Sequence, residues 1–193
     1  VYKQSEKTEF YRKYFPIFYL IFRRNYNNFK FYLGVNLMIK INIVAIGDIK
    51  EKYFTDAIKE YSKRLSRFAN LNIIEIKENN PKSDSQKDIL SALKKDALEI
   101  KKHLSGFIIV LDVKGTEIDS VVLSKQIEKV TQTNSTITFV IGASNGLDEE
   151  IKNLANLRLS FSKMTFPHQL MRVILLEQIY RAFTILNNIT YHK

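Results

Sequence analysis

The sequence predicts an α/β domain in which a mostly parallel sheet is flanked by helices. Two observations lead to this prediction. From residue 38 onward, short apolar segments of strand length alternate with longer segments of helical spacing, as in domains built from repeated strand–helix units. Two of the strand-like segments, residues 107–113 (FIIVLDV) and 137–141 (ITFVI), are apolar almost throughout, which is typical of parallel strands buried on both faces.

The first half of this domain contains two predicted strands and two predicted helices. Residues 39–46 (IKINIVAI) alternate in the manner of a strand, and Gly47 ends them. Residues 71–76 predict a second strand. Residues 86–103 predict a helix from their apolar spacing. Residues 50–65 predict another helix, whose apolar positions recur at Phe54, Ala57, Ile58, Tyr61 and Leu65.

The second half continues the alternation through the two apolar strands named above. The other elements expected there are a helix at 119–130, a short helix at 148–154, a strand at 157–161 and a long helix at 168–186. This last helix is apolar on nearly every face, so it is buried either inside its own domain or in an interface between two copies of the chain. The second alternative favours a homodimer.

Residues 1–37 differ in composition from the rest of the chain. They hold 12 of the 23 aromatic residues, and their seven Lys/Arg and two Glu contribute half of the formal net charge of +10. Their apolar run is too short to span a bilayer, although an amphipathic helix at a membrane surface is a possible alternative. We expect residues 1–37 to be an appendage outside the fold and outside the native protein, which would then begin at Met38.

Composition excludes several classes of site. The chain has no cysteine, so disulfides, zinc–thiolate sites and cysteine nucleophiles are excluded, and a cytoplasmic location is compatible with this. The three histidines, His103, His168 and His192, have no paired-ligand spacing, so we expect no metal. The net charge of +10 favours a polyanionic partner, either nucleic acid or an anionic membrane surface, over a basic surface that binds nothing.

Three segments at the predicted carboxyl ends of strands are candidates for a ligand site, since parallel α/β sheets bind ligands at that edge. They are residues 111–115, 141–147 and 161–168. The second contains Gly142 and an Asn145–Gly146 turn, where backbone can approach a ligand closely. In the third, small and hydroxyl residues alternate with Met164 and Phe166 before Pro167 opens the last helix. An ordinary turn and a core-packing loop are the competing interpretations.

At these residues the chain resembles a known family. Residues 38–193 resemble the RlmH family of the SPOUT superfamily, which are 23S rRNA pseudouridine N3-methyltransferases. The most specific pieces are FVIGASNGL, LSFSKMTFPHQLMRVILLEQIYRAF and the terminal YHK. The resemblance implies a SPOUT methyltransferase domain at 38–193 with a deep trefoil knot at its C-terminal end, and a homodimer paired around that knot.

The resemblance also implies the reaction and its site. The cofactor is S-adenosylmethionine, and the substrate is a pseudouridine in the helix 69 loop of 23S rRNA in the assembled ribosome. The family's cofactor contacts match Leu111, Gly142, Phe161, Ser162, Lys163, Met164, Thr165 and Phe166. The family usually has glycine where Ala143 stands and proline where Thr190 stands.

Candidate residues for the RNA side of the site come from the last helix and the tail. Histidine has a suitable pKa for a general base, which favours His192, with Tyr191 stacking on or beside the target base and Lys193 meeting phosphate. Arg172 is a candidate for binding phosphate or orienting the tail, and His168 for contacting RNA. Glu177 is a weaker candidate base, because Arg181 follows at helical spacing. Two other functions remain open: a non-catalytic RNA-binding module of the same fold, and a protein held at a membrane by residues 1–37.

Overall fold

The computed structural model describes residues 38–192. The predictions about residues 1–37 and about Lys193 lie outside this range. Within it, five strands form one sheet in the order β2-β1-β4-β3-β5, and every neighbouring pair is parallel. The predicted α/β class is therefore confirmed, with a sheet that is parallel throughout these residues.

Strands and helices alternate as the sequence predicts. The strands are β1 (Ile39–Ile46), β2 (Ala69–Ile76), β3 (Phe107–Glu117), β4 (Thr136–Ile141) and β5 (Leu157–Ser160). The helices are α4 (Lys52–Leu65), α5 (Gln86–Lys101), α6 (Ser120–Thr133), α7 (Glu149–Asn153) and α8 (His168–Leu186). The predicted bounds of β1 and α8 are confirmed to the residue, and most others differ by one to three residues.

Side chains that cap helix N-termini explain several of these bounds. Ser85 accepts a hydrogen bond from the Asp88 N–H, and Asp119 accepts one from the Val122 N–H. Asp148 does the same for α7 through the Glu150 N–H. Each of these oxygens satisfies an amide that has no partner inside its own helix. The helices at 86, 120 and 149 therefore begin where a short polar side chain precedes the apolar pattern.

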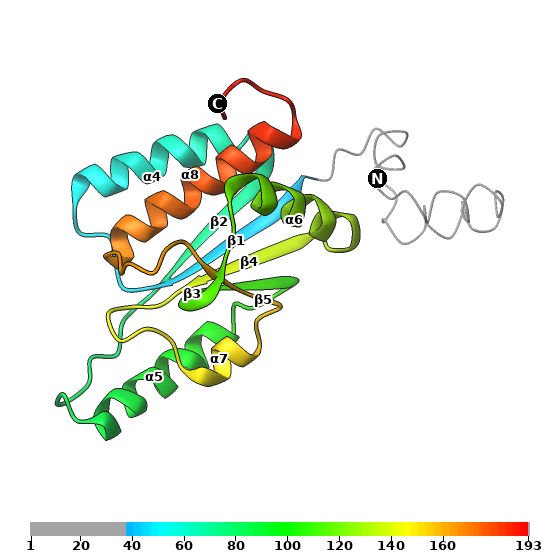
Figure 1. Cartoon of the computed structure of the whole chain (residues 1–193). Helices are drawn as coiled ribbons and strands as arrows, with labels where there is room; N and C mark the ends of the chain where they lie inside the picture. Colours follow the sequence, from blue (N-terminus) through cyan, green and yellow to red (C-terminus); the bar gives the residue numbers. More distant parts are fainter. Residues whose placement is uncertain (1–37, 193) are drawn as a thin grey trace, which may run out of the picture. The chain divides into compact units, whose positions relative to one another are not determined.

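The sheet separates two apolar cores, because alternate residues of each strand face opposite sides. Ile41 and Ile43 of β1 belong to the core under α4, α6 and α8, whereas Val44 and Ile46 belong to the core under α5 and α7. Figure 1 shows these two helical layers on the two sides of the sheet. The domain thus has three layers, α/β/α.

Helix α8 packs inside its own domain, against both α4 and α6. Among its fully buried residues are Leu175, Leu176, Ile179 and Ala182. This packing accounts for much of its apolar character without a second copy of the chain, so the homodimer stays a prediction. The trefoil knot also stays a prediction.

Strand β3 is longer than the sequence predicts. We expected it to end near Val113, but it continues to Glu117 through an irregularity. Leu159 of β5 lies opposite both Leu111 and Thr116, so the residues between them bulge out of the ladder. Such bulges change the direction of a strand locally and are frequent beside functional sites.

Candidate functional site

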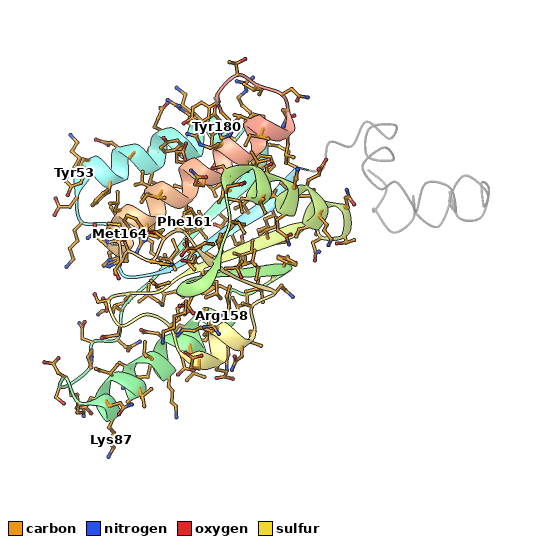
Figure 2. All side chains as sticks on the ribbon, in the orientation of Figure 1. Tyr53, Lys87, Arg158, Phe161, Met164 and Tyr180 are labelled. Carbon is orange, nitrogen blue, oxygen red and sulfur yellow. The ribbon has the colours of Figure 1, made fainter. Side chains whose placement is uncertain are left out.

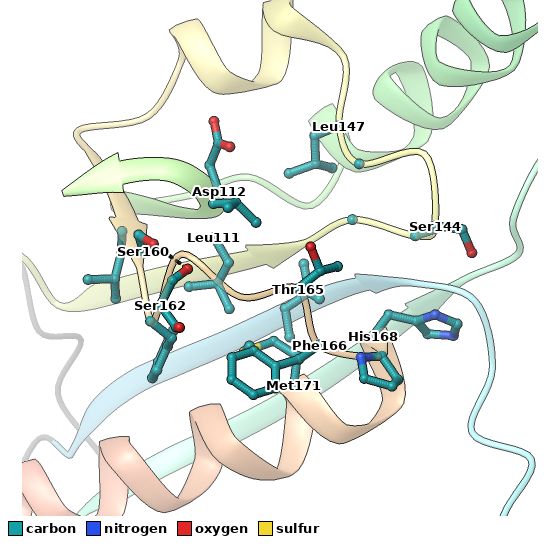
Figure 3. Close-up of a pocket in the computed structure, with 18 of the residues that line it drawn as sticks. Leu111, Asp112, Ser144, Leu147, Ser160, Ser162, Thr165, Phe166, His168 and Met171 are labelled. Atoms are coloured by element: carbon teal, nitrogen blue, oxygen red, sulfur yellow. Dashed lines mark hydrogen bonds between the residues drawn. The ribbon is translucent and has the colours of Figure 1, made fainter. Parts of the chain in front are cut away.

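A crevice opens at the carboxyl ends of β3, β4 and β5. Its volume is about 680 Å³, within the range of small-molecule sites. Its walls come from the β3 bulge, from the loop after β4 and from the segment between β5 and α8 (Figure 3). All strands are parallel, so these three segments, far apart in sequence, meet at one edge of the sheet, as expected for a ligand site in an α/β fold.

Seven of the eight residues predicted to bind cofactor line this crevice. They are Leu111, Gly142, Phe161, Ser162, Met164, Thr165 and Phe166. The eighth, Lys163, is exposed and is not among the lining residues. The fold thus brings together the strand ends that the sequence singled out, while their contact with a cofactor stays a prediction.

The loop after β4 is a tight turn that requires glycine twice. Gly146 has a φ of +79°, and its N–H donates to the Ala143 carbonyl at 2.9 Å. A Cβ on Gly142 would lie 2.5 Å from the Gly146 carbonyl oxygen, so the two strands of the turn are too close for a side chain there. Ala143 is not strained, because Asn188 is the single non-glycine residue with positive φ between residues 38 and 192. Its difference from the family therefore costs no backbone strain.

The β3 bulge places a carboxylate on the crevice wall. Arg158 of β5 donates to Asp112 Oδ2 at 2.5 Å, and the Lys114 N–H donates to Asp112 Oδ1 at 3.1 Å. Burial raises the pKa of Asp112, but these hydrogen bonds outweigh it and hold the pKa below its ordinary value. Asp112 is therefore an anion at neutral pH. The sequence placed Asp112 in a candidate segment but gave no signal for its pairing with Arg158, since the two are 46 residues apart.

The segment between β5 and α8 is held by local hydrogen bonds of its serines. Ser160 Oγ donates to the Ser162 carbonyl at 3.0 Å, and the Met164 N–H donates to Ser162 Oγ at 2.9 Å. The Met164 side chain stays 70% exposed at the rim, whereas Phe166 is partly buried on the crevice wall. The segment therefore offers apolar side chains and hydroxyl groups to the same space.

The first turn of α8 forms one wall of the crevice, and the position of Arg172 on it differs from the prediction. His168 and Met171 line the crevice. Arg172 does not: it is 1% exposed, and it donates to Glu75 Oε1 at 2.5 Å and to the carbonyls of Ile46 and Gly47. A guanidinium engaged in this way presents no group to phosphate. None of the hydrogen-bond partners of Arg172 belongs to the tail. Its position therefore fits neither of the predicted roles, phosphate binding and orientation of the tail.

The C-terminal tail lies on the other half of α8. Tyr191 packs edge-on against the Tyr180 ring at 5.0 Å, and its hydroxyl donates to Glu177 Oε1 at 3.2 Å. His192 is exposed, with Nδ1 3.3 Å from Arg181 Nη1. Figure 2 shows Met164 beside the first turn of α8 and Tyr180 toward the far end of that helix. Glu177 follows His168 by nine residues, or about 14 Å of helix, so Tyr191 and His192 do not line the crevice of their own chain.

The contacts around Glu177 decide which tail groups can move a proton. Glu177 Oε1 accepts from Arg181 Nε at 2.9 Å as well as from Tyr191, so its carboxylate is occupied. Burial, together with Tyr61 and Glu177, raises the pKa of Tyr191 to about 12, so this phenol stays protonated at neutral pH. His192 is the remaining described tail group with a free ring nitrogen for proton exchange.

No three His, Asp or Glu side chains within residues 38–192 approach one another as metal ligands would. No helix in this range combines the length and apolar composition needed to cross a membrane.

Comparison with known proteins adds a family. A model described as predicted SPOUT methyltransferase matches residues 39–192. Ribosomal RNA large subunit methyltransferase H of Fusobacterium nucleatum is 49% identical over 159 residues, covering 80% of this chain and all of the relative. The protein of the same name from Clostridium botulinum is 52% identical with the same coverage. That from Caldicellulosiruptor saccharolyticus is 44% identical over 155 residues, covering 79% of this chain and 99% of the relative.

Proposed function

Since the chain belongs to the SPOUT methyltransferase family, we propose that it transfers a methyl group from S-adenosylmethionine to large-subunit ribosomal RNA. We propose N3 of a pseudouridine in the helix 69 loop of 23S rRNA, in the assembled ribosome, as the acceptor. The relatives' names support an rRNA substrate. Action on ribosomes implies a cytoplasmic enzyme.

The crevice at the ends of β3, β4 and β5 is the observation that carries this proposal. Its volume of about 680 Å³ suits a nucleoside-sized ligand. Leu111, Leu147 and Phe166 provide an apolar slot suited to an aromatic ring, and the 161–166 segment provides hydroxyl groups beside it. The carboxylate of Asp112 also lies on the wall, where it is paired with Arg158.

The predicted cofactor contacts assign the residues that would hold the ligand. Leu111, Gly142 and residues 161–166 would enclose it, with Lys163 at the outer side of the segment. When bound, S-adenosylmethionine supplies an electrophilic methyl group on a sulfonium. The residues of the chain supply alignment and a crevice from which apolar walls exclude water. Such a site favours a displacement in which opposite charges disappear, and alignment accounts for much of the rate.

The C-terminal tail is proposed to remove the imide proton of the target base. His192 is the proposed base, because Glu177 is occupied and Tyr191 is protonated. Tyr191 would stack on or beside the target base, as aromatic side chains do on unpaired RNA bases. His192 lies beyond the reach of its own crevice, so we propose a homodimer in which one subunit's tail serves the partner's crevice.

His168 and Lys193 are the residues proposed to contact RNA, whereas Arg172 is buried and engaged inside the domain. Residues 38–193 carry a net charge of only +5, so a short naked RNA would be held by few phosphate contacts and released by salt. An assembled ribosome offers a larger and more ordered surface. We therefore expect ribosomes to be modified far better than free rRNA.

The test is incorporation of tritiated methyl groups into ribosomes that carry the pseudouridine but lack its methyl group. Nuclease digestion and mass spectrometry then locate the methyl group. Incorporation at another nucleotide would overturn the target and leave the enzyme class intact. Binding of S-adenosylhomocysteine and ribosomes without any transfer would instead identify a non-catalytic RNA-binding module.

A further inference from the structure

Arg172 is an unusual residue for the interior of this domain. It is the largest side chain in residues 38–192 that is almost fully buried, at 1% exposure. It lies on α8, one helical turn after His168, and therefore directly behind the crevice. A buried guanidinium requires a specific set of acceptors.

The acceptors of Arg172 come from the ends of two neighbouring strands. Nη1 donates to Glu75 Oε1 at the end of β2, at 2.5 Å. Nη2 donates to the Ile46 carbonyl at the end of β1, at 3.0 Å, and to the Gly47 carbonyl just beyond it. These partners are 97 to 126 residues away in sequence. One side chain thus joins α8 to both β1 and β2.

Two neighbours of Arg172 on α8 contact the same loop between β1 and α4. Gln169 Oε1 accepts from the Lys50 N–H at 3.1 Å. Gly47 has a φ of +86°, and a Cβ built on it would lie 3.3 Å from His168 Nε2. Hydrogen bonds of Gln169 and Arg172 therefore join the first turn of α8 to residues 46–50, and His168 lies close beside Gly47. We call this arrangement of His168, Gln169 and Arg172 the α8 latch.

The α8 latch and the crevice share the same helical turn. His168 and Met171 line the crevice, while Arg172 faces the strand ends. In Figure 3 the labelled His168 and Met171 lie at the start of α8, below the opening that Thr165 and Phe166 also border. A displacement of this turn away from the β1–α4 loop would therefore move one wall of the crevice.

Stability alone does not explain the α8 latch well. Taking a guanidinium out of water is costly, and apolar residues of similar volume often stabilise a core as much or more. The partner Glu75 has a side chain that is 41% exposed, and Arg172 Nε is buried without a hydrogen-bond partner. The forked geometry of arginine does, however, fix the relative position of several acceptors.

We propose that Arg172 is a positioning residue, which holds the first turn of α8 at the distance from the β1–α4 loop that ligand binding in the crevice requires. This inference rests on the proposed function, because the ligand is the S-adenosyl cofactor. It predicts that loss of the guanidinium fork weakens the cofactor more than it destabilises the fold.

The experiment compares Arg172→Met and Arg172→Lys with the unaltered full chain. Calorimetry gives the Kd for S-adenosylhomocysteine, and thermal unfolding gives Tm. We expect Arg172→Met to lower Tm, because the Ile46 and Gly47 carbonyls lose their donor. We also expect it to raise the Kd about tenfold to a hundredfold, more than Arg64→Met or Arg172→Lys does, because the crevice wall is misplaced. Arg172→Lys keeps the charge but bridges fewer acceptors, so its Kd should be intermediate. In the ribosome assay, the KM for S-adenosylmethionine should rise while the KM for ribosomes stays constant.

Arg64→Met is the matched control. Arg64 pairs with Glu60 at 2.8 Å on the surface of α4, outside the α8 latch and the crevice. Like Arg172→Met, the Arg64→Met variant loses an arginine–carboxylate pair. Its Kd for S-adenosylhomocysteine should nevertheless equal that of the unaltered chain. If Arg172→Met does not fold, Glu75→Gln takes its place in the experiment. This substitution keeps the shape of the exposed partner of Arg172 and removes its charge.

Amide hydrogen exchange separates failure of this inference from failure of the proposed function. If the unaltered chain does not bind S-adenosylhomocysteine, the proposed function fails, and exchange in residues 47–50 and 164–171 still tests the α8 latch. Faster exchange there in Arg172→Met, with the rest of the chain unchanged, supports positioning. A folded Arg172→Met variant with an unaltered Kd would overturn the positioning role. So would a Kd that rises across all variants only in proportion to the fall in Tm.

Discussion

Gly142→Ala tests the geometry of the crevice with a single methyl group. In the present turn that methyl carbon would lie 2.5 Å from the Gly146 carbonyl oxygen and 2.7 Å from its carbonyl carbon. Carbon–oxygen contacts in proteins are about 3.3 Å or longer, so the Gly146 peptide must move by roughly 0.8 Å. The obstacle is backbone, which cannot rotate away as a side chain would.

Both stability and ligand affinity should respond. Inserting a methyl group into a closely packed site costs about 1–3 kcal/mol, and each kcal/mol lowers Tm by about 2–4 °C in a domain of this size. Because the displaced peptide belongs to the crevice wall, we expect the Kd for S-adenosylhomocysteine to rise on the order of tenfold to a hundredfold, a loss of about 1.4–2.8 kcal/mol of binding free energy. Thermal unfolding and calorimetry measure the two effects on the same sample.

Gly146→Ala is the control, since it strains the same turn without a collision. Gly146 has a φ of +79°, and a Cβ there meets nothing within 4 Å. The expected cost is about 1 kcal/mol of backbone strain, with a smaller change in Kd than Gly142→Ala shows. Equal Kd values for Gly142→Ala and the unaltered chain, at equal Tm, would refute the close approach of the two strands of the turn.

Three other predictions concern the tail and the first turn of α8. Deleting residues 191–193 should leave the Kd for S-adenosylhomocysteine unchanged, because the tail does not line the crevice of its own chain and is proposed to act on the RNA base in the partner's crevice. It should remove most methyl transfer to ribosomes; transfer at the intact rate would exclude the tail from catalysis. The pKa of Tyr191 is raised to about 12 by burial and its neighbours, so in an ultraviolet titration the difference between the unaltered chain and Tyr191→Phe should show no ionisation at pH 10; a normal titration would contradict the burial of this phenol. Burial, and then Arg172, lower the pKa of His168. The unfolded chain therefore binds a proton that the folded chain resists, and the free energy of unfolding falls as pH drops below about 6.5, the unperturbed value. His168→Gln should flatten Tm against pH below about 6.5, and an unchanged slope would show that His168 is not the group responsible.

The sequence by itself determined the class of the fold, because the relevant signals are local. A strand buried on both faces must be apolar throughout, and this requirement is visible in residues 137–141. A helix pattern with a polar cap, as at Asp119, likewise reports its own start. Strand ends in a parallel sheet converge on one edge by geometry alone, so residues 111–115, 141–147 and 161–168 were already candidates for one site, whereas the individual cofactor contacts within them came from the resemblance to the family.

Only the tertiary structure decided which strands pair with one another and which side chains meet across the sheet and its helices. The β3 bulge follows from the pairing of Leu159 with both Leu111 and Thr116, and no local pattern reports which strand lies beside β3. Arg172 is the sharper case. From sequence an arginine near a site suggests a phosphate ligand, yet its acceptors are Glu75 and two backbone carbonyls brought close by the packing of α8 on the sheet. The free energy of a buried charge depends on partners distant in the chain, so its role becomes visible when those partners are in place.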